Sequence, residues 1–434
     1  MPFFKTDLLN ISRRIFRHKL FQNSVVYILA HVLRTGIPFL LLPVLTRYLT
    51  PADYGYFSVF EIFINILIIF VSLNISSAVA VAFYKKDSAQ FQVYLGNGII
   101  LTLISFIITL SIIVIFHQPL TAFLNVSSGW LILGACAALM NAFFTLLLIV
   151  LQMKGKAEIY GSLQIVQMLL NVVISLFLII KAEWGWQGRV LGIVLSYLIV
   201  GSISLYILIR NMKVRFLPNT DYIRDIFKFS APLIPHTLSG WIMTSTDRIM
   251  INTMVGSFQT GLYSISFQIG MIIELIASSF NQAWSPFLFR VLSENDHEKR
   301  VKLVKITYLC FILLIGMVFF LKLLTPLIFR YFINEKYAGG MQIVEWVLWA
   351  CVAHAMYHLV VGYIYFAQKT HLLFQVSIFA ALLNVVLNFY FIRSNGVVGA
   401  AQATAISAFV NFLLIWYVSS RLVKMPWLFW KNTK

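Results

Sequence analysis

The stretch Leu-Leu-Asn-Val-Val at residues 169–173 recurs letter for letter at residues 382–386. Each copy lies in an apolar run, and each run is followed by a Gly-x-x-Gly pair, Gly185 with Gly188 in the first half and Gly396 with Gly399 in the second. A further echo joins residues 55–58 to residues 261–264, at nearly the same offset. Three echoes in the same order indicate an internal duplication of the chain.

The composition requires that much of the surface face lipid. Of the 434 residues, 60% are hydrophobic and 11% are charged, whereas soluble proteins have a charged share of roughly 25%. A helix needs roughly 20 apolar residues to cross a bilayer. Twelve such runs are predicted as transmembrane helices, at residues 22–46, 54–75, 92–116, 130–152, 158–180, 187–209, 230–254, 260–284, 303–325, 341–366, 371–392 and 397–420.

The net charge of +18 could indicate nucleic-acid binding if it formed one face of a soluble domain. Instead, most lysines and arginines fall in every second connection between the predicted helices. The first of these basic segments is the amphipathic stretch of the first twenty residues. We expect this stretch to stay on the mature chain. Cytoplasmic connections retain positive charge. The pattern therefore predicts both termini in the cytoplasm and attraction to anionic membrane lipid, with no nucleic-acid partner.

Six predicted helices separate the two copies of the repeat, so both halves have the same orientation in the membrane. We expect an all-α integral membrane protein with two six-helix bundles, residues 1–209 and 226–434, joined by a basic cytoplasmic linker at 210–225 and enclosing a central cavity. Duplicated bundles of this kind are typical of transporters. The sequence contains no phosphate-binding Gly-x-x-x-x-Gly-Lys-Ser/Thr loop, so ATP is not expected to be the direct energy source. No segment outside the predicted helices is long enough for a catalytic domain, and we expect a transporter without a cofactor rather than an enzyme.

Ionisable residues inside the predicted helices are the candidate site, because each costs roughly 2.5–3.5 kcal/mol at the bilayer centre. Arg34 and His31 share one stripe of the first helix, and Arg34 lies near mid-membrane. Asn65 is on the polar stripe of the second helix, and Arg248 is in the seventh. The candidate substrate-binding residues are therefore His31, Arg34, Asn65 and Arg248.

Three acids occur in the same helices: Glu61, Asp247 and Glu274. Two interpretations stay open. The acids could form buried ion pairs with Arg34 and Arg248 that lock one conformation, or they could carry a coupling cation, Na⁺ or H⁺, while the arginines hold an anionic headgroup.

Prolines in equivalent helices are candidate hinges, because proline interrupts helical hydrogen bonding. Pro38 and Pro43 lie in the first predicted helix, and Pro232 and Pro235 in the seventh.

No metal site is expected. The three cysteines share no ligand spacing. His354 and His358 have the i, i+4 spacing of zinc ligands, but no third ligand is evident in the sequence, which favours hydrogen-bonded helix contacts.

Residues 42–55, Leu-Pro-Val-Leu-Thr-Arg-Tyr-Leu-Thr-Pro-Ala-Asp-Tyr-Gly, resemble the first-loop signature of bacterial polysaccharide flippases. These O-antigen and capsule repeat-unit exporters are part of the multidrug/oligosaccharidyl-lipid/polysaccharide exporter superfamily. Residues 246–248, 283–286 and 396–401 resemble later segments of the same family.

The resemblance implies a twelve-helix flippase in the bacterial inner membrane. Its expected substrate is an undecaprenyl-pyrophosphate-linked oligosaccharide, moved from the cytoplasmic to the periplasmic leaflet by alternating access, with a polysaccharide polymerase and a chain-length regulator as protein partners. Arg34 and Arg248 would meet the pyrophosphate. Two alternatives stay open: a cation-coupled multidrug exporter of the same superfamily, which the acids favour, and a membrane-embedded glycosyl ligase or polymerase.

Overall fold

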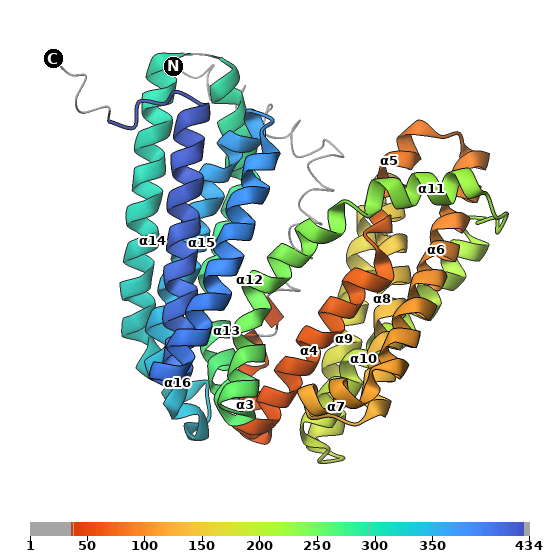
Figure 1. The fold of residues 1–434 in the computed structure, drawn as a ribbon, viewed down its shortest axis with the longest axis horizontal. Helices are drawn as coiled ribbons and strands as arrows, with labels where there is room; N and C mark the ends of the chain where they lie inside the picture. The colour runs from red at the N-terminus through yellow and green to blue at the C-terminus, as the bar shows by residue number, and fades with distance from the viewer. Residues whose placement is uncertain (1–35, 38, 295, 429–434) are drawn as a thin grey trace, which may run out of the picture. The chain divides into compact units, whose positions relative to one another are not determined.

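The structure, a computed structural model, describes residues 36, 37, 39–294 and 296–428. These residues form helices joined by short connections, with no β-strand among them (Figure 1). The expected all-α class is confirmed. The described part contains nine helical segments that are long and apolar enough to cross a membrane, as expected for a multi-pass membrane protein.

The chain divides into two compact units. The first, unit 1, covers most of the N-terminal half from Phe60 to Thr237. Its helices include α8, α9 and α10, of which α10 packs against both of the others. The helices that lie wholly in this unit are α5 (Ile75–Lys85), α6 (Ser88–Ile115), α7 (His117–Leu124), α8 (Ser128–Met153), α9 (Ala157–Ile180), α10 (Gly185–Arg210) and α11 (Thr220–Ser230).

Unit 2 starts at Leu238 and also takes in the segment between Ile37 and Phe60. In its core α15 packs against α13, α14 and α16. The elements that lie wholly in this unit are α3 (Leu42–Tyr48), α13 (Ser257–Ser293), α14 (His297–Tyr331), η1 (Glu335–Gly340), α15 (Met341–Phe366) and α16 (Thr370–Leu422). Two helices pass from one unit to the other, α4 (Pro51–Ser72) at Val59 and α12 (Leu233–Met254) at Thr237.

The segment that the sequence assigns to a linker, residues 210–225, is bound to α6. The buried amide of Asn97 donates to the carbonyl of Leu217 at 2.9 Å and accepts from the backbone N–H of Asn219 at 2.8 Å. At Gly96 a Cβ atom would lie 2.1 Å from the carbonyl oxygen of Arg215, so only glycine lets the segment pass this close. The two compact units divide after Thr237, within α12, and the expected bundles at residues 1–209 and 226–434 stay a prediction.

The two Gly-x-x-Gly turns share one feature of their backbone. Gly185 and Gly396 both adopt positive φ, +54° and +58°, a region that favours glycine. At Gly188 an added Cβ atom would lie 3.1 Å from the backbone of Leu178, and at Gly399 it would lie 1.9 Å from the carbonyl oxygen of Phe391. In each unit, therefore, the helix that follows the turn packs directly against the end of the helix that precedes it. In α16 the reversal at Gly396 separates two helical segments, the eleventh and twelfth predicted runs.

The sequence places four candidate hinge prolines inside predicted helices. The three that the structure describes lie at the beginnings of helices instead. Pro43 is in the first turn of α3, Pro232 lies in the turn before α12, and Pro235 is in the first turn of α12. Proline is well tolerated there, because the first N–H groups of a helix have no intrahelical acceptor. Pro38 lies outside the described residues. That these positions act as hinges stays a prediction.

Candidate functional site

The candidate site residues of the first predicted helix, His31 and Arg34, lie outside the described residues. The other candidates fall in three places: Glu61 and Asn65 on α4, Asp247 and Arg248 on α12, and Glu274 on α13. Asp247, Arg248 and Glu274 belong to unit 2, whereas Glu61 and Asn65 belong to unit 1.

Asp247 is the centre of a buried polar cluster in unit 2. Its side chain is 1% exposed and accepts three hydrogen bonds, from the hydroxyls of Tyr263 at 2.7 Å and Thr404 at 2.8 Å and from the amide of Asn388 at 2.9 Å. The donors come from α13 and from both segments of α16. All three are uncharged, so they solvate the carboxylate without neutralising it.

Asparagine side chains extend this cluster. The amide of Asn388 also donates to the side-chain oxygen of Asn384 at 3.1 Å, and Asn384 donates to Ser407 at 3.0 Å. The buried Oδ1 atom of Asn388 has no hydrogen-bond partner within the described part of the chain. A buried carbonyl oxygen without a donor is costly, and beside a buried carboxylate it is a suitable ligand for a cation. We define Asp247, Asn384, Asn388 and Thr404 as the Asp247 cluster.

Arg248 does not pair with its neighbour in sequence. Its guanidinium lies 4.7 Å from the centre of the Phe267 ring, a cation–π contact that directs it along α13. Its Nε atom is buried and has no hydrogen-bond partner among the described residues. In that part of the chain Arg248 forms no salt bridge with Glu61, Asp247 or Glu274; the two interpretations of the acids both stay predictions.

Glu61 and Asn65 are one turn apart on α4, and both are exposed. Ser58, on the same predicted stripe, is buried. The polar stripe of α4 is thus buried at Ser58 and exposed at Glu61 and Asn65.

Glu274 is held by two histidines of α15. Its Oε2 atom lies 2.9 Å from Nδ1 of His354 and its Oε1 atom lies 2.9 Å from Nε2 of His358. The sequence predicted hydrogen-bonded helix contacts for the histidines but did not identify Glu274 as their partner. The three side chains form a group that could hold a metal ion. We call them the Glu-His-His cluster.

One buried cation was missed by the sequence interpretation. Arg189 of α10 is only 7% exposed. Its Nη1 atom donates to the side-chain oxygen of Asn171 and, at 2.8 Å, to the hydroxyl of Ser175. These contacts join α10 to α9 next to the Gly185 turn. Asn171 is the repeat counterpart of Asn384, which indicates that both units place a polar contact at this level.

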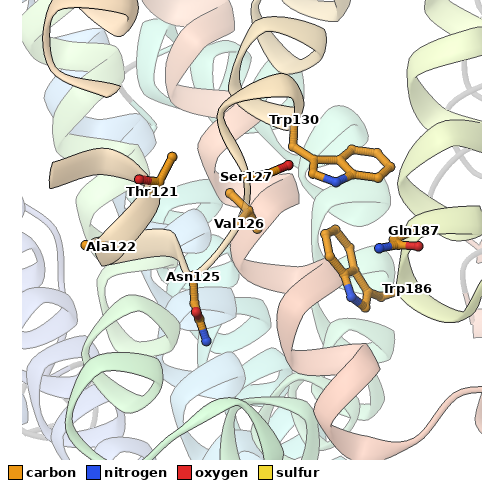
Figure 2. Close-up of a pocket in the computed structure, with 8 residues that line it drawn as sticks. All are labelled: Thr121, Ala122, Asn125, Val126, Ser127, Trp130, Trp186 and Gln187. Atoms are coloured by element: carbon orange, nitrogen blue, oxygen red, sulfur yellow. The ribbon is translucent and has the colours of Figure 1, made fainter. Parts of the chain in front are cut away.

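A second region that the sequence did not reveal is an open pocket of about 490 Å³ in unit 1 (Figure 2). It lies where α7 leads into α8 and where α10 begins. The rings of Trp130 and Trp186 form one wall, with their centroids 5.2 Å apart. The polar side chains that complete the lining are Thr121, Asn125, Ser127 and Gln187.

Comparisons with known proteins agree with this architecture. The family model described as "Polysaccharide biosynthesis protein" matches residues 20–292, and the MatE model matches residues 232–390. The chain is 24% identical to "Lsg locus putative protein 1" of Haemophilus influenzae, over 85% of this chain and 90% of that protein. It is 21% identical to "Probable low-salt glycan biosynthesis flippase Agl15" of Haloferax volcanii, over 91% and 82%.

The fold is also similar to that of a solved transporter. The structure described as "Lipid II flippase MurJ, inward closed conformation" aligns over 92% of this chain and 87% of its own, with a TM-score of 0.75 and 13% sequence identity. Because the polysaccharide biosynthesis model covers more than half of the sequence, the first-loop resemblance is confirmed. The chain belongs to the polysaccharide biosynthesis protein family, the flippases of the multidrug/oligosaccharidyl-lipid/polysaccharide exporter superfamily, and is a transporter rather than an enzyme.

Proposed function

We propose that this protein is a flippase that moves undecaprenyl-pyrophosphate-linked oligosaccharide repeat units, of O-antigen or capsule, from the cytoplasmic to the periplasmic leaflet of the bacterial inner membrane. The observation that carries the proposal is the family match over residues 20–292. The flippase names of two similar proteins support it. In this proposal the twelve predicted helices form two six-helix bundles with both termini in the cytoplasm.

The physical problem is to carry a diphosphate through a hydrocarbon layer. An unpaired charge there costs many kcal/mol, but guanidinium groups in a hydrated cavity replace the lost water by paired, charge-assisted hydrogen bonds. Arg248 fits this role, because its guanidinium forms no salt bridge with an acid among the described residues. Arg34 and His31 complete the phosphate site in the proposal.

The Asp247 cluster fits the coupling role. A buried carboxylate and the free carbonyl oxygen of Asn388 offer oxygen ligands of the kind that Na⁺ prefers, or a carboxylate that takes up H⁺. A bound cation would neutralise a charge that is expensive in this environment. We propose that Na⁺ or H⁺ enters here during alternating access, and that Glu61 and Glu274 assist in gating.

The pocket beside Trp130 and Trp186 fits the sugar part of the substrate. Its volume lies in the range of small-molecule sites, roughly 300–1,000 Å³. Indole faces offer flat apolar area against which the C–H face of a sugar ring packs, while the amides of Asn125 and Gln187 offer both donors and acceptors for hydroxyl groups. In the predicted topology this pocket opens to the periplasm, where the oligosaccharide arrives.

The hinge role of the prolines rests on where the units divide. The divisions at Ile37 and Thr237 fall next to Pro38 and Pro235 in the sequence. We propose that these positions, with Pro43 and Pro232, absorb the change in backbone angles during transport. A polysaccharide polymerase and a chain-length regulator are the proposed partners that receive the exported repeat unit.

Deletion of the gene in its native host tests the proposal in cells. We expect loss of surface polysaccharide together with accumulation of the lipid-linked repeat unit, since synthesis continues while export stops. Loss of polysaccharide without accumulation of that intermediate would contradict a flippase role.

The second candidate, a cation-coupled multidrug exporter, is favoured by the MatE match over residues 232–390. Expression in a drug-sensitive strain separates the two. Raised drug resistance that depends on Asp247, without restored polysaccharide in the deletion strain, would favour the exporter.

A further inference from the structure

We propose that Glu274, His354 and His358 form a binding site for a divalent transition-metal ion of the Zn²⁺ class, which joins α13 to α15. The three side chains each offer one ligand atom, and these atoms lie within 4.8 Å of one another. The inference is independent of the transported substrate, because it rests only on the chemistry and spacing of the three groups.

The donor set is one that zinc uses. Two imidazole nitrogens and one carboxylate oxygen, with the fourth position left to water, are a common three-ligand arrangement. The bonds are about 2.0–2.1 Å long, which places neighbouring ligands of a tetrahedral site roughly 3.3–3.4 Å apart. Both nitrogen–oxygen distances to Glu274 are 2.9 Å. Binding therefore requires these two nitrogen–oxygen distances to lengthen by a few tenths of an ångström, and any ligand pair at the 4.8 Å limit of the cluster to close by about 1.4 Å.

The charge of the cluster also suits a dication. A carboxylate with two neutral imidazoles carries a single negative charge, and neither Lys nor Arg forms a salt bridge with Glu274 in the described part of the chain. When the metal binds, each imidazole presents a lone pair at the nitrogen that faces Glu274, and the proton held there moves to the other ring nitrogen or to water.

The helices hold the ligands in place before any ion binds. His354 and His358 are one turn apart on the same face of α15, with ring centroids 4.8 Å apart. One turn before Glu274, an added Cβ atom on Gly270 would lie 2.7 Å from a side-chain carbon of Val347 and 2.8 Å from Sγ of Cys351. The absence of a side chain at Gly270 thus lets α13 approach α15 closely enough for Glu274 to reach both rings.

The described residues cover the cluster only in part. The side chain of His354 is 43% exposed, that of His358 is 22% exposed and that of Glu274 is 19% exposed. One side of the cluster is therefore not covered by these residues, and the proposal places the fourth ligand, a water molecule, on that side. The ring of Tyr357 lies parallel to that of His354, at an interplanar angle of 2° and a centroid distance of 5.7 Å, and restricts how far His354 can swing away.

Cobalt titration of the purified full-length chain in detergent, after removal of metals with a chelator, is the direct test. Co²⁺ stands in for Zn²⁺ and reports its ligand geometry through visible absorption. We expect one Co²⁺ bound per chain, displaced by Zn²⁺, and a rise in the melting temperature on Zn²⁺ addition. The substitutions Glu274→Gln, His354→Gln and His358→Gln should each weaken Co²⁺ binding by at least the roughly 10–100-fold that loss of an outer-shell partner costs.

The matched control is His117→Gln, which removes an exposed histidine of unit 1 and should leave Co²⁺ binding unchanged. A second variant, His358→Cys, keeps a ligand at the same position. It should retain binding and add the sulfur-to-cobalt charge-transfer band, a result that a merely hydrogen-bonded helix contact would not give. Absence of saturable Co²⁺ binding in the folded wild-type protein, or Co²⁺ binding as tight in all three Gln variants as in the wild type, would overturn the site.

Discussion

The hydroxyl of Tyr263 donates a 2.7 Å hydrogen bond to Oδ2 of Asp247, and both side chains are almost completely buried, at 0% and 1% exposure. Thr404 donates to the same oxygen. No salt bridge neutralises the carboxylate within the described part of the chain. A buried charge with uncharged donors alone is expensive, and this expense is the physical basis for placing a coupling cation beside Asp247.

Replacement of Asp247 by Asn should remove the dependence of transport on that cation. The amide has nearly the shape of the carboxylate but lacks its charge, so the cation loses its main source of attraction. We expect the transport rate of Asp247→Asn to fall at least tenfold and to stop responding to a Na⁺ or pH gradient. The measurement is transport into proteoliposomes with each gradient imposed separately, and a gradient response equal to that of the wild type would remove Asp247 from the coupling role.

Tyr263→Phe is the matched control for that experiment. It deletes one donor to Asp247 and leaves the charge in place. Loss of a hydrogen bond to a buried charged group costs about 1.5–3 kcal/mol, and inside membranes such contacts average less, about 0.6 kcal/mol. We therefore expect a lower melting temperature with the response to the gradient retained. Loss of that response in both variants, at equal protein levels, would show that the cluster is needed for structure alone.

The all-helical, multi-pass class could be predicted because it follows from length and hydropathy, whereas the twelve-helix arrangement in two bundles stays a prediction. The apolar runs, the Gly185 and Gly396 turns and the all-helical class all depend on local sequence. The contacts of Asn97 with the segment after α10 could not be predicted in this way, because they join residues that are 120 and 122 positions apart in the sequence. No local pattern shows that a basic, proline-containing segment will pack against α6.

Parts of the candidate site were found from ionisable residues inside apolar runs, which is how Asp247, Arg248 and Glu274 were selected. Their partners were not found. Tyr263 and Thr404 have ordinary side chains for membrane helices, and nothing in the sequence brings them to Asp247. Likewise, Glu274 and His354 are 80 residues apart, so the Glu-His-His cluster required the packing of α13 against α15. The one available signal was that Glu274 and the two histidines are predicted to lie at similar depths in the membrane.

Arg34→Ala tests the cationic site that the sequence predicts in the first helix. If Arg34 binds the diphosphate, export should be lost while the protein remains folded and inserted, and Arg34→Lys should restore part of it because the charge returns without the two-pronged geometry. Surface polysaccharide and the membrane level of the protein are measured together. A fall in protein level that matches the loss of polysaccharide would instead assign Arg34 a structural ion pair.

If the pocket lined by Trp130 and Trp186 binds sugar rings, its loss should lower the transport rate more for a long oligosaccharide than for a single sugar. With Trp186→Ala, which removes one indole wall, we expect a severalfold lower transport rate for a full repeat unit. Transport of a lipid diphosphate that carries a single sugar should change little, because the phosphate site is untouched. Competition between the two substrates in one assay provides the measurement. Equal loss for both would show that the pocket does not distinguish sugar length.

Gly399→Ala should destabilise unit 2. A Cβ atom at this position would lie 1.9 Å from the carbonyl oxygen of Phe391, so the two segments of α16 would have to separate. Overpacking of this kind costs about 1–3 kcal/mol, and we expect a clear fall in the melting temperature of the purified protein.

The matched control for that substitution is Gly316→Ala on α14, where an added Cβ atom would have no neighbour within 4 Å. Its melting temperature should be unchanged or slightly higher, because alanine favours helix more than glycine does. Equal melting temperatures for the Gly399 and Gly316 variants would show that the close approach at Gly396–Gly399 is not needed.

The central claim is tested most directly by following one lipid-linked oligosaccharide from leaflet to leaflet. Purified protein is placed in liposomes that contain a fluorescent polyprenyl-diphosphate oligosaccharide, and an impermeant quencher is added outside to report how fast the inner pool becomes accessible. We expect complete, protein-dependent quenching in wild-type vesicles, with only the outer-leaflet fraction quenched in protein-free vesicles and in vesicles with Arg34→Ala. Quenching in wild-type vesicles that stops at the outer-leaflet fraction would contradict the proposed flippase.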